Sequence, residues 1–315
     1  MRVTAKDGTD PLWEAAVGSW TSGDALREAV SAGVVMAQAV RCARDMAGWA
    51  EKYPTLFSAK PIDVTLFNGV ACANAFGSPG LTAGELRMVN RVCLWYFGLD
   101  WMVDHLATSR AEVDDIARRC LDVADGASPA DGDELASFLA EIRDELAASP
   151  TYSSLRDVWR DELRRALDAT AREWTWKALR AAGKGTPPTL DEYLENADNI
   201  GSAWINLSHW IAGGDRRLPE HLEELNAAGR EVQKVLRLLN DLATYDRDLS
   251  WGDLNALMLG ADRDEVTRHI ALLVGRCREL ILPLRARCPE QAEYLERQVG
   301  FSSGFYAHGD YWGTL

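Results

Sequence analysis

Three oxygen-bearing side chains recur at intervals of four residues in the second half of the chain: Asn240, Thr244 and Asp248. An α-helix turns once every ~3.6 residues, so this spacing would place them in one column on one helical face. Magnesium prefers such oxygen ligands and completes its coordination shell with water and the phosphates of a substrate. Residues 240–248 therefore predict one half of a magnesium site.

Two carboxylates upstream repeat the spacing. Asp100 and Asp104 are four residues apart and would again share a helical face. Apolar runs precede the two motifs, at residues 92–97 and 235–239. Polar groups that follow such buried segments are costly unless they are paired or bound to metal. Two facing helices that carry these motifs could hold a metal cluster and a diphosphate between them.

Each motif also has a purely structural interpretation. An isolated Asp-x-x-x-Asp is usually a solvated helix face, and an isolated Asn-Asp-x-x-Thr is more often a helix start with the Asn as its cap. The order of the two motifs, their spacing and two flanking arginines, Arg237 and Arg247, favour a binding site.

Together the motifs resemble those of the class I terpene synthases. Residues 240–248 match the pattern (N/D)Dxx(S/T)xxxE with Asp248 in place of Glu. Residues 100–104 match DDxxD only at the first and fifth positions, because Trp101 stands at the second. The resemblance implies Asp100 as the main ligand of its motif and about three Mg²⁺ ions. It implies metal ligands at Asp100, Asp104, Asn240, Thr244 and Asp248, and diphosphate contacts from Arg237, Arg247 and Tyr306.

Asn199-Ile200-Gly201-Ser202 is expected to interrupt a helix that starts near Asp191. A glycine in the middle of a helix costs about 1 kcal/mol relative to alanine. Close packing against a neighbouring helix would explain this glycine. The functional alternative is a break whose freed carbonyls face the cavity and stabilise positive charge. The residues expected to shape the cavity are Trp101, Ile200, Gly201, Ser202 and Trp204.

Residues 188–196, followed by Ile200-Gly201, resemble the labdane-type class I diterpene synthases, the kaurene synthases among them. Ala197 stands where many other bacterial terpene synthases carry an Arg that senses diphosphate. The resemblance implies ionisation of a copalyl-type bicyclic diphosphate and cyclisation of the carbocation to a polycyclic diterpene. Linear geranylgeranyl or farnesyl diphosphate is the alternative substrate.

Class II cyclases begin instead by protonating a double bond with an Asp-x-Asp-Asp acid. The nearest match here, Asp131-Gly132-Asp133-Glu134, ends in Glu. Asp131 and Glu134 have the spacing of a helix capping box, which is the better interpretation. A bicyclic substrate would therefore require a separate class II diterpene cyclase as a partner enzyme.

Three other functions stay open. A chain-elongating prenyltransferase should show a second DDxxD motif, and this sequence lacks one. A head-to-head prenyl synthase of the squalene or phytoene type should show two DxxxD motifs, for which Asp241 and Asp246 have the wrong spacing. A non-catalytic helical scaffold would have no reason to bury two acidic motifs. Mg²⁺-dependent release of diphosphate separates that scaffold from the enzymes.

The chain has 315 residues, of which 47% are hydrophobic and 26% charged, and a net charge of −14. This balance argues against nucleic acid and anionic membrane surfaces as partners. No apolar run approaches the ~18 residues that span a bilayer, and residues 1–7 lack the apolar core of a signal peptide. We therefore expect a cytoplasmic protein, with a homodimer as one oligomeric alternative. Six scattered cysteines are expected to be reduced and mostly buried.

Helical periodicity covers most of the chain, and strand signals are nearly absent. With no repeat or long linker, we expect one all-α domain over residues 1–315, a class I terpene synthase-type bundle around a central cavity. Twelve tryptophans suit either packing or the lining of such a cavity. Helices are expected at residues 23–50, 80–100, 133–146, 152–179, 191–211, 218–248, 264–285 and 289–305.

Overall fold

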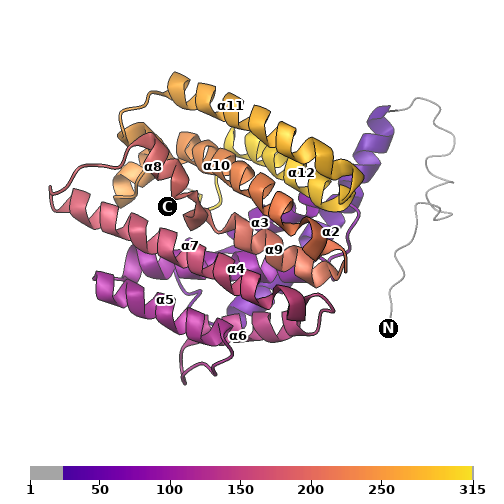
Figure 1. The fold of residues 1–315 in the computed structure, drawn as a ribbon, viewed down its shortest axis with the longest axis horizontal. Helices are drawn as coiled ribbons and strands as arrows, with labels where there is room; N and C mark the ends of the chain where they lie inside the picture. Colours follow the sequence, from indigo (N-terminus) through magenta and orange to yellow (C-terminus); the bar gives the residue numbers. More distant parts are fainter. Residues whose placement is uncertain (1–23, 314–315) are drawn as a thin grey trace.

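The computed structural model describes residues 24–313, which form helices joined by short loops, without a strand in this range (Figure 1). The all-α prediction is confirmed. Gly23 and residues 1–7, on which two expectations rested, lie outside the described part. The α-helices are α2 (Asp24–Lys52), α3 (Val64–Gly77), α4 (Arg87–Trp101), α5 (Arg110–Ala124), α6 (Glu134–Ala147), α7 (Tyr152–Ala181), α8 (Leu190–Glu195), α9 (Ser202–Gly213), α10 (Leu218–Trp251), α11 (Arg263–Ile281) and α12 (Pro289–Tyr306).

The helices pack as a bundle in which α10, the longest, contacts α9, α11 and α12 (Figure 1). On the other side α7 packs against α5 and α9, while α3 lies against α2 and α12. No helix within residues 24–313 is both long and apolar enough to cross a membrane. The bundle therefore encloses its own apolar interior and leaves room for a cavity between α4, α9, α10 and α12.

Part of that interior is a stack of tryptophans. Trp204 is 1% exposed, and its ring centroid lies 5.1 Å from that of Trp95 and 5.6 Å from that of Trp159. Trp95 donates to the Leu135 carbonyl (2.9 Å) and Trp159 to the Ser208 hydroxyl (2.8 Å). These rings hold α4, α7 and α9 together. The expectation that Trp204 shapes the cavity is therefore wrong, because its ring is core packing.

Helix starts follow local capping, which corrects two expectations. Asp133, not Asp131, caps α6, accepting from the Ala136 amide, so the expected Asp131–Glu134 capping box is wrong. The helix expected from residue 80 begins only at Arg87, since Glu85 folds back onto Thr82 and closes a turn there. Helix α3 was missed because it is apolar on nearly all sides, as expected for a helix enclosed by others.

The expected interruption near residue 200 is present. Helix α8 ends at Glu195, a 3₁₀ turn, η2 (Ala197–Ile200), follows, and α9 begins after Gly201. Gly201 has φ +73°, and a Cβ there would lie 2.3 Å from the Tyr96 ring. The backbone therefore needs both the left-handed conformation and the missing side chain of glycine.

A second irregularity follows α4, which continues as a π-helical turn, η1 (Met102–Leu106). Such turns are rare and are frequent at functional sites. Because this turn carries Asp104, Asp100 and Asp104 do not lie on one regular α-helix as expected.

We expect Gly201→Ala to destabilise the fold by about 2–5 kcal/mol, because it combines a strained φ with overpacking against Tyr96. Gly275→Ala is the matched control: Gly275 is exposed on α11 with nothing within 4 Å of an added Cβ. This control should leave stability unchanged or raise it by up to about 1 kcal/mol. Urea unfolding of both variants measures the difference, and equal stabilities would contradict the assigned role of Gly201.

Candidate active site

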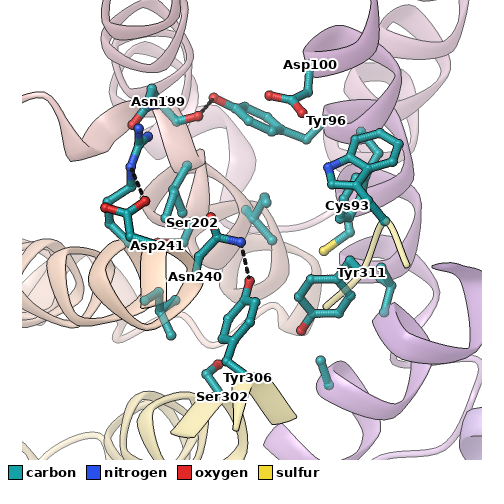
Figure 2. A pocket seen from close by; sticks show the side chains of 18 of the residues that line it. Cys93, Tyr96, Asp100, Asn199, Ser202, Asn240, Asp241, Ser302, Tyr306 and Tyr311 are labelled. Atoms are coloured by element: carbon teal, nitrogen blue, oxygen red, sulfur yellow. Dashed lines mark hydrogen bonds and ion pairs between the residues drawn. The ribbon is translucent and has the colours of Figure 1, made fainter. Parts of the chain in front are cut away.

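Asp100, Asp104, Asn240 and Asp248 line one cavity of about 260 Å³. Figure 2 shows Asp100 on one side and Asn240 with Tyr306 on the other. The acidic end is formed by the C-terminal parts of α4 and α10, and the rest of the wall is largely apolar and aromatic. The structure thus brings together two motifs that are 140 residues apart in the sequence.

The column on α10 is tied together internally. The Thr244 hydroxyl lies 2.6 Å from Asp248 Oδ2, to which it donates, and 2.9 Å from the Asn240 carbonyl. The amide of Asn255 also donates to Asp248 Oδ2 (2.9 Å). Burial raises the pKa of Asp248. Thr244 is 1% exposed and does not itself line the cavity, so it orients Asp248 while Asn240 and Asp248 face the open space.

Asp241, beside Asn240, has a different environment. Its carboxylate is fully buried and accepts from the Tyr193 hydroxyl (3.0 Å) and the Ala256 amide (3.1 Å). Burial raises the pKa of Asp241 to about 7. These bonds join α10 to α8 and to the short 3₁₀ turn η3 (Ala256–Met258). Asp241, the second residue of the downstream motif, therefore stabilises the packing of the elements that surround the site.

Arg237 borders the cavity but is already engaged. Its Nε donates to the Tyr193 hydroxyl (2.7 Å) and its Nη2 to Glu173 on α7 (2.7 Å). Its guanidinium also lies over the Tyr193 ring, 4.3 Å from the centroid. This cation is therefore fixed in place, with its charge shared between Glu173 and the nearby Asp241.

Arg247 contacts the C-terminal segment. Its Nη1 lies 2.5 Å from Asp310, its Nη2 lies 3.2 Å from Asp248, and its guanidinium stacks 5.2 Å from the Trp251 ring. Asp310 also accepts from the amides of Trp312 and Gly313. The chain after α12 therefore turns back to the cavity, where Tyr311 and Trp312 line the wall. Of this part of the chain, the family resemblance had implied only Tyr306, the last residue of α12.

Lys177 and Asp253 were missed entirely. The Lys177 ammonium, on α7, lies 2.7 Å from Asp104 and 2.5 Å from Asp253, two residues beyond the end of α10. Burial opposes its charge, but the two carboxylates outweigh that effect and raise the pKa of Lys177. No motif marks either residue. The only signal was Asp253 itself, an acidic residue five positions after Asp248.

Asp100 forms no ion pair with any cation of residues 24–313. Burial, together with the nearby carboxylates of Asp104 and Asp253, raises the pKa of Asp100 well above its ordinary value, although Lys177 lies near enough to lower it against these effects. Burial also raises the pKa of Asp104, against the effect of Lys177. This end of the cavity therefore holds more negative charge than its own cations neutralise.

The break before α9 reaches the cavity through Asn199, Ile200 and Ser202. The Tyr96 hydroxyl donates to the Asn199 carbonyl (2.9 Å), and the buried Asn199 side-chain Oδ1 has no hydrogen-bond partner in the described part of the chain. The Ser202 hydroxyl donates to Gln233 (3.1 Å). Gly201 packs against Tyr96 at this break. Close packing therefore requires a glycine here, whether or not the freed carbonyls also stabilise positive charge.

Trp101 does not line the cavity, contrary to expectation. Its ring stacks on His105, with centroids 4.2 Å apart, and packs against Trp251 and Trp312. Trp312 and Phe97, whose centroids are 5.1 Å apart, form the wall there instead. Trp101 can therefore influence the cavity through Trp312, against which it packs.

The donors at this end are suited to a hard divalent cation that also binds substrate. They are oxygen atoms from two sides of the cavity, the preference of Mg²⁺. Within residues 24–313 no three His, Cys, Asp or Glu side chains already converge on one ion position. An ion held here would thus complete its shell with phosphate oxygens and water, as Mg²⁺ commonly does.

Comparisons with known proteins agree with this geometry. Residues 91–274 match the family model described as terpene synthase family 2, C-terminal metal binding. The chain is 30% identical to the ent-pimara-9(11),15-diene synthase of Streptomyces sp. (strain KO-3988) over 281 residues, 88% of this chain and 93% of the relative.

Two solved structures share the fold. The linalool/nerolidol synthase from Streptomyces clavuligerus, in complex with 2-fluorogeranyl diphosphate, is 19% identical with a TM-score of 0.65, covering 86% of this chain and 97% of that one. The 2-methylisoborneol synthase from Streptomyces coelicolor A3(2), in complex with Mg²⁺ and geranyl-S-thiolodiphosphate, is 17% identical with a TM-score of 0.66, covering 89% and 93%.

We expect replacement by alanine to cost much more stability at Asp241 than at its neighbour Asn240. Asp241→Ala leaves buried donors without an acceptor and should destabilise the fold by about 3–5 kcal/mol. Asn240→Ala loses only a long contact to Tyr306 (3.4 Å) and should cost less than about 1 kcal/mol. Chemical unfolding compares the two, and a larger loss in Asn240→Ala would contradict the division of roles.

Proposed function

The chain belongs to terpene synthase family 2, whose members are lyases acting on prenyl diphosphates, and we propose that it is a labdane-related class I diterpene synthase. In this proposal a copalyl-type bicyclic diphosphate loses its diphosphate with the help of Mg²⁺. The carbocation then cyclises further to a polycyclic diterpene. The observation that supports it most is the convergence of Asp100 with Asn240 and Asp248 on one cavity with a largely apolar remainder.

Three lines support the diterpene substrate. The relative at 30% identity is named as a pimaradiene synthase, a diterpene-forming enzyme. The resemblance of residues 188–196 and Ile200-Gly201 to labdane-type enzymes points the same way. Finally, Ala197 is buried in η2 and offers no diphosphate contact at the position where other bacterial relatives carry Arg.

We assign the mouth of the cavity to the diphosphate. Asp100, Asn240 and Asp248, with Asp104 and Thr244 supporting, would hold Mg²⁺, which supplies Lewis-acid stabilisation of the departing diphosphate. Arg237 and Arg247 add fixed positive charge on the α10 side, and Tyr306, whose hydroxyl accepts from Asn240, lines the same cavity. Such prearranged charges stabilise a leaving group without reorganising during the reaction.

The remaining wall would guide the carbocation. Ile200, Leu236 and Phe97 offer apolar or aromatic surface, and Trp312 closes the rim. Aromatic faces stabilise cations, and a dry cavity protects them from water. Ser202, turned to Gln233, contributes a fixed dipole near the helix break.

A class II cyclase would have to supply the bicyclic substrate. The nearest Asp-x-Asp-Asp match does not line the cavity, and its Asp133 caps α6 and is ion-paired with Arg119. The partner enzyme is therefore part of the proposal, and linear geranylgeranyl or farnesyl diphosphate is the alternative substrate that would need no partner.

Incubation with copalyl, geranylgeranyl and farnesyl diphosphates tests the proposal, with and without Mg²⁺. We expect a cyclic hydrocarbon from the copalyl substrate, at a kcat/KM at least about tenfold above the linear ones, and no product without Mg²⁺. Gas chromatography with mass spectrometry identifies products. Turnover of only the linear substrates would contradict the labdane assignment and leave class I chemistry standing.

A further inference from the structure

A second hollow, of about 540 Å³, adjoins the cavity, and the two spaces share one lining residue. It is lined by the end of α3, the following loop, the end of α9 and the start of α12. Among the residues that the structure describes, Tyr294 alone borders both spaces.

Three helices show that this hollow lies at the end opposite the diphosphate site. Along α3 the lining passes from Asn74 in the cavity to Gly77 in the hollow, and along α9 from Ile205 to His209. Along α12 it runs backward from Tyr306, beside Asn240, to Tyr294. Each step follows one helix away from the acidic mouth, so Tyr294 forms the cavity floor.

The ring of Tyr294 is firmly seated. It is 3% exposed, and a Cβ on Gly77 would lie 3.1 Å from it, so the missing side chain of Gly77 lets the ring lie against α3. The His209 ring packs on its other side, with centroids 5.1 Å apart. Burial lowers the pKa of His209 to about 4, so His209 is neutral near pH 7. The floor is therefore aromatic and uncharged, which suits the hydrocarbon end of a substrate.

We propose that Tyr294 sets the length of the hydrocarbon that the cavity accepts, and that it admits a twenty-carbon chain while excluding a twenty-five-carbon one. This inference rests on the proposed function. With the diphosphate fixed at the mouth, the far end of the substrate must reach toward α3 and the start of α12, where the ring closes the path. Removing the ring would join the cavity to the hollow and give room for a further isoprene unit.

The test compares Tyr294→Ala with Tyr294→Phe, which keeps the ring and removes only the hydroxyl. Calorimetry in Mg²⁺ measures the affinities for the unreactive S-thiolo analogues of linear C20 and C25 prenyl diphosphates. We expect the C25-to-C20 affinity ratio to rise at least about tenfold in Tyr294→Ala and to stay at the wild-type value in Tyr294→Phe.

Loss of a buried ring can also impair folding, so circular dichroism accompanies each variant. Tyr294→Leu keeps an apolar side chain in the core and should raise the ratio by a smaller factor. An unchanged ratio in a folded Ala or Leu variant overturns the role of Tyr294. Failure of the wild type to bind the linear C20 analogue would also overturn that role. Failure of the wild type to bind the S-thiolo analogue of copalyl diphosphate would instead contradict the proposed function, which separates the two claims.

Discussion

The structure depends on one electrostatic constraint: more carboxylates than cations lie at the mouth of the cavity. Among the described residues, six carboxylates line the cavity, while Arg237 and Arg247 line it and Lys177 pairs at its rim. Each cation joins elements that are distant in sequence: Arg237 joins α10 to α7, Lys177 joins α7 to the turn after α4 and to the chain after α10, and Arg247 joins α10 to the C-terminal segment. Removing one partner of such buried pairs is strongly destabilising.

The same surplus explains why the mouth would accept metal and diphosphate together. When all six lining carboxylates are ionised, their charge exceeds that of the three cations by three. About three Mg²⁺ ions, the number implied by the family resemblance, would balance this surplus and the charge of a prenyl diphosphate at once. Without them, burial and mutual repulsion raise the pKa values of Asp100 and Asp104. The ion pairs of Arg237, Lys177 and Arg247 are thus satisfied within the protein, whereas Asp100 remains available to bind the ligand.

Sequence patterns predicted the features that depend on a single helix or its ends. The column Asn240–Thr244–Asp248 was predictable because the helical period fixes it, and the break at Gly201 because glycine marks it. Contacts between distant segments carried no such signal. The pairing of Lys177 with Asp253, the return of Asp310 to Arg247 and the packing of Trp204 depend on how helices meet. The π-helical turn that carries Asp104 likewise breaks the period from which its position was inferred.

Thermal unfolding with inorganic diphosphate tests the central claim, that the carboxylate surplus at the mouth binds metal and diphosphate jointly. Ligand that binds only the folded state at about 100 times its Kd stabilises it by about 2.7 kcal/mol. We predict such stabilisation of the wild type only when Mg²⁺ and diphosphate are both present. Asp246→Ala, which alters an exposed carboxylate of the same helix as Asn240 and Asp248, should match the wild type, and Asp100→Ala should show almost none. Equal stabilisation of Asp100→Ala, or full stabilisation by diphosphate without Mg²⁺, would contradict the account.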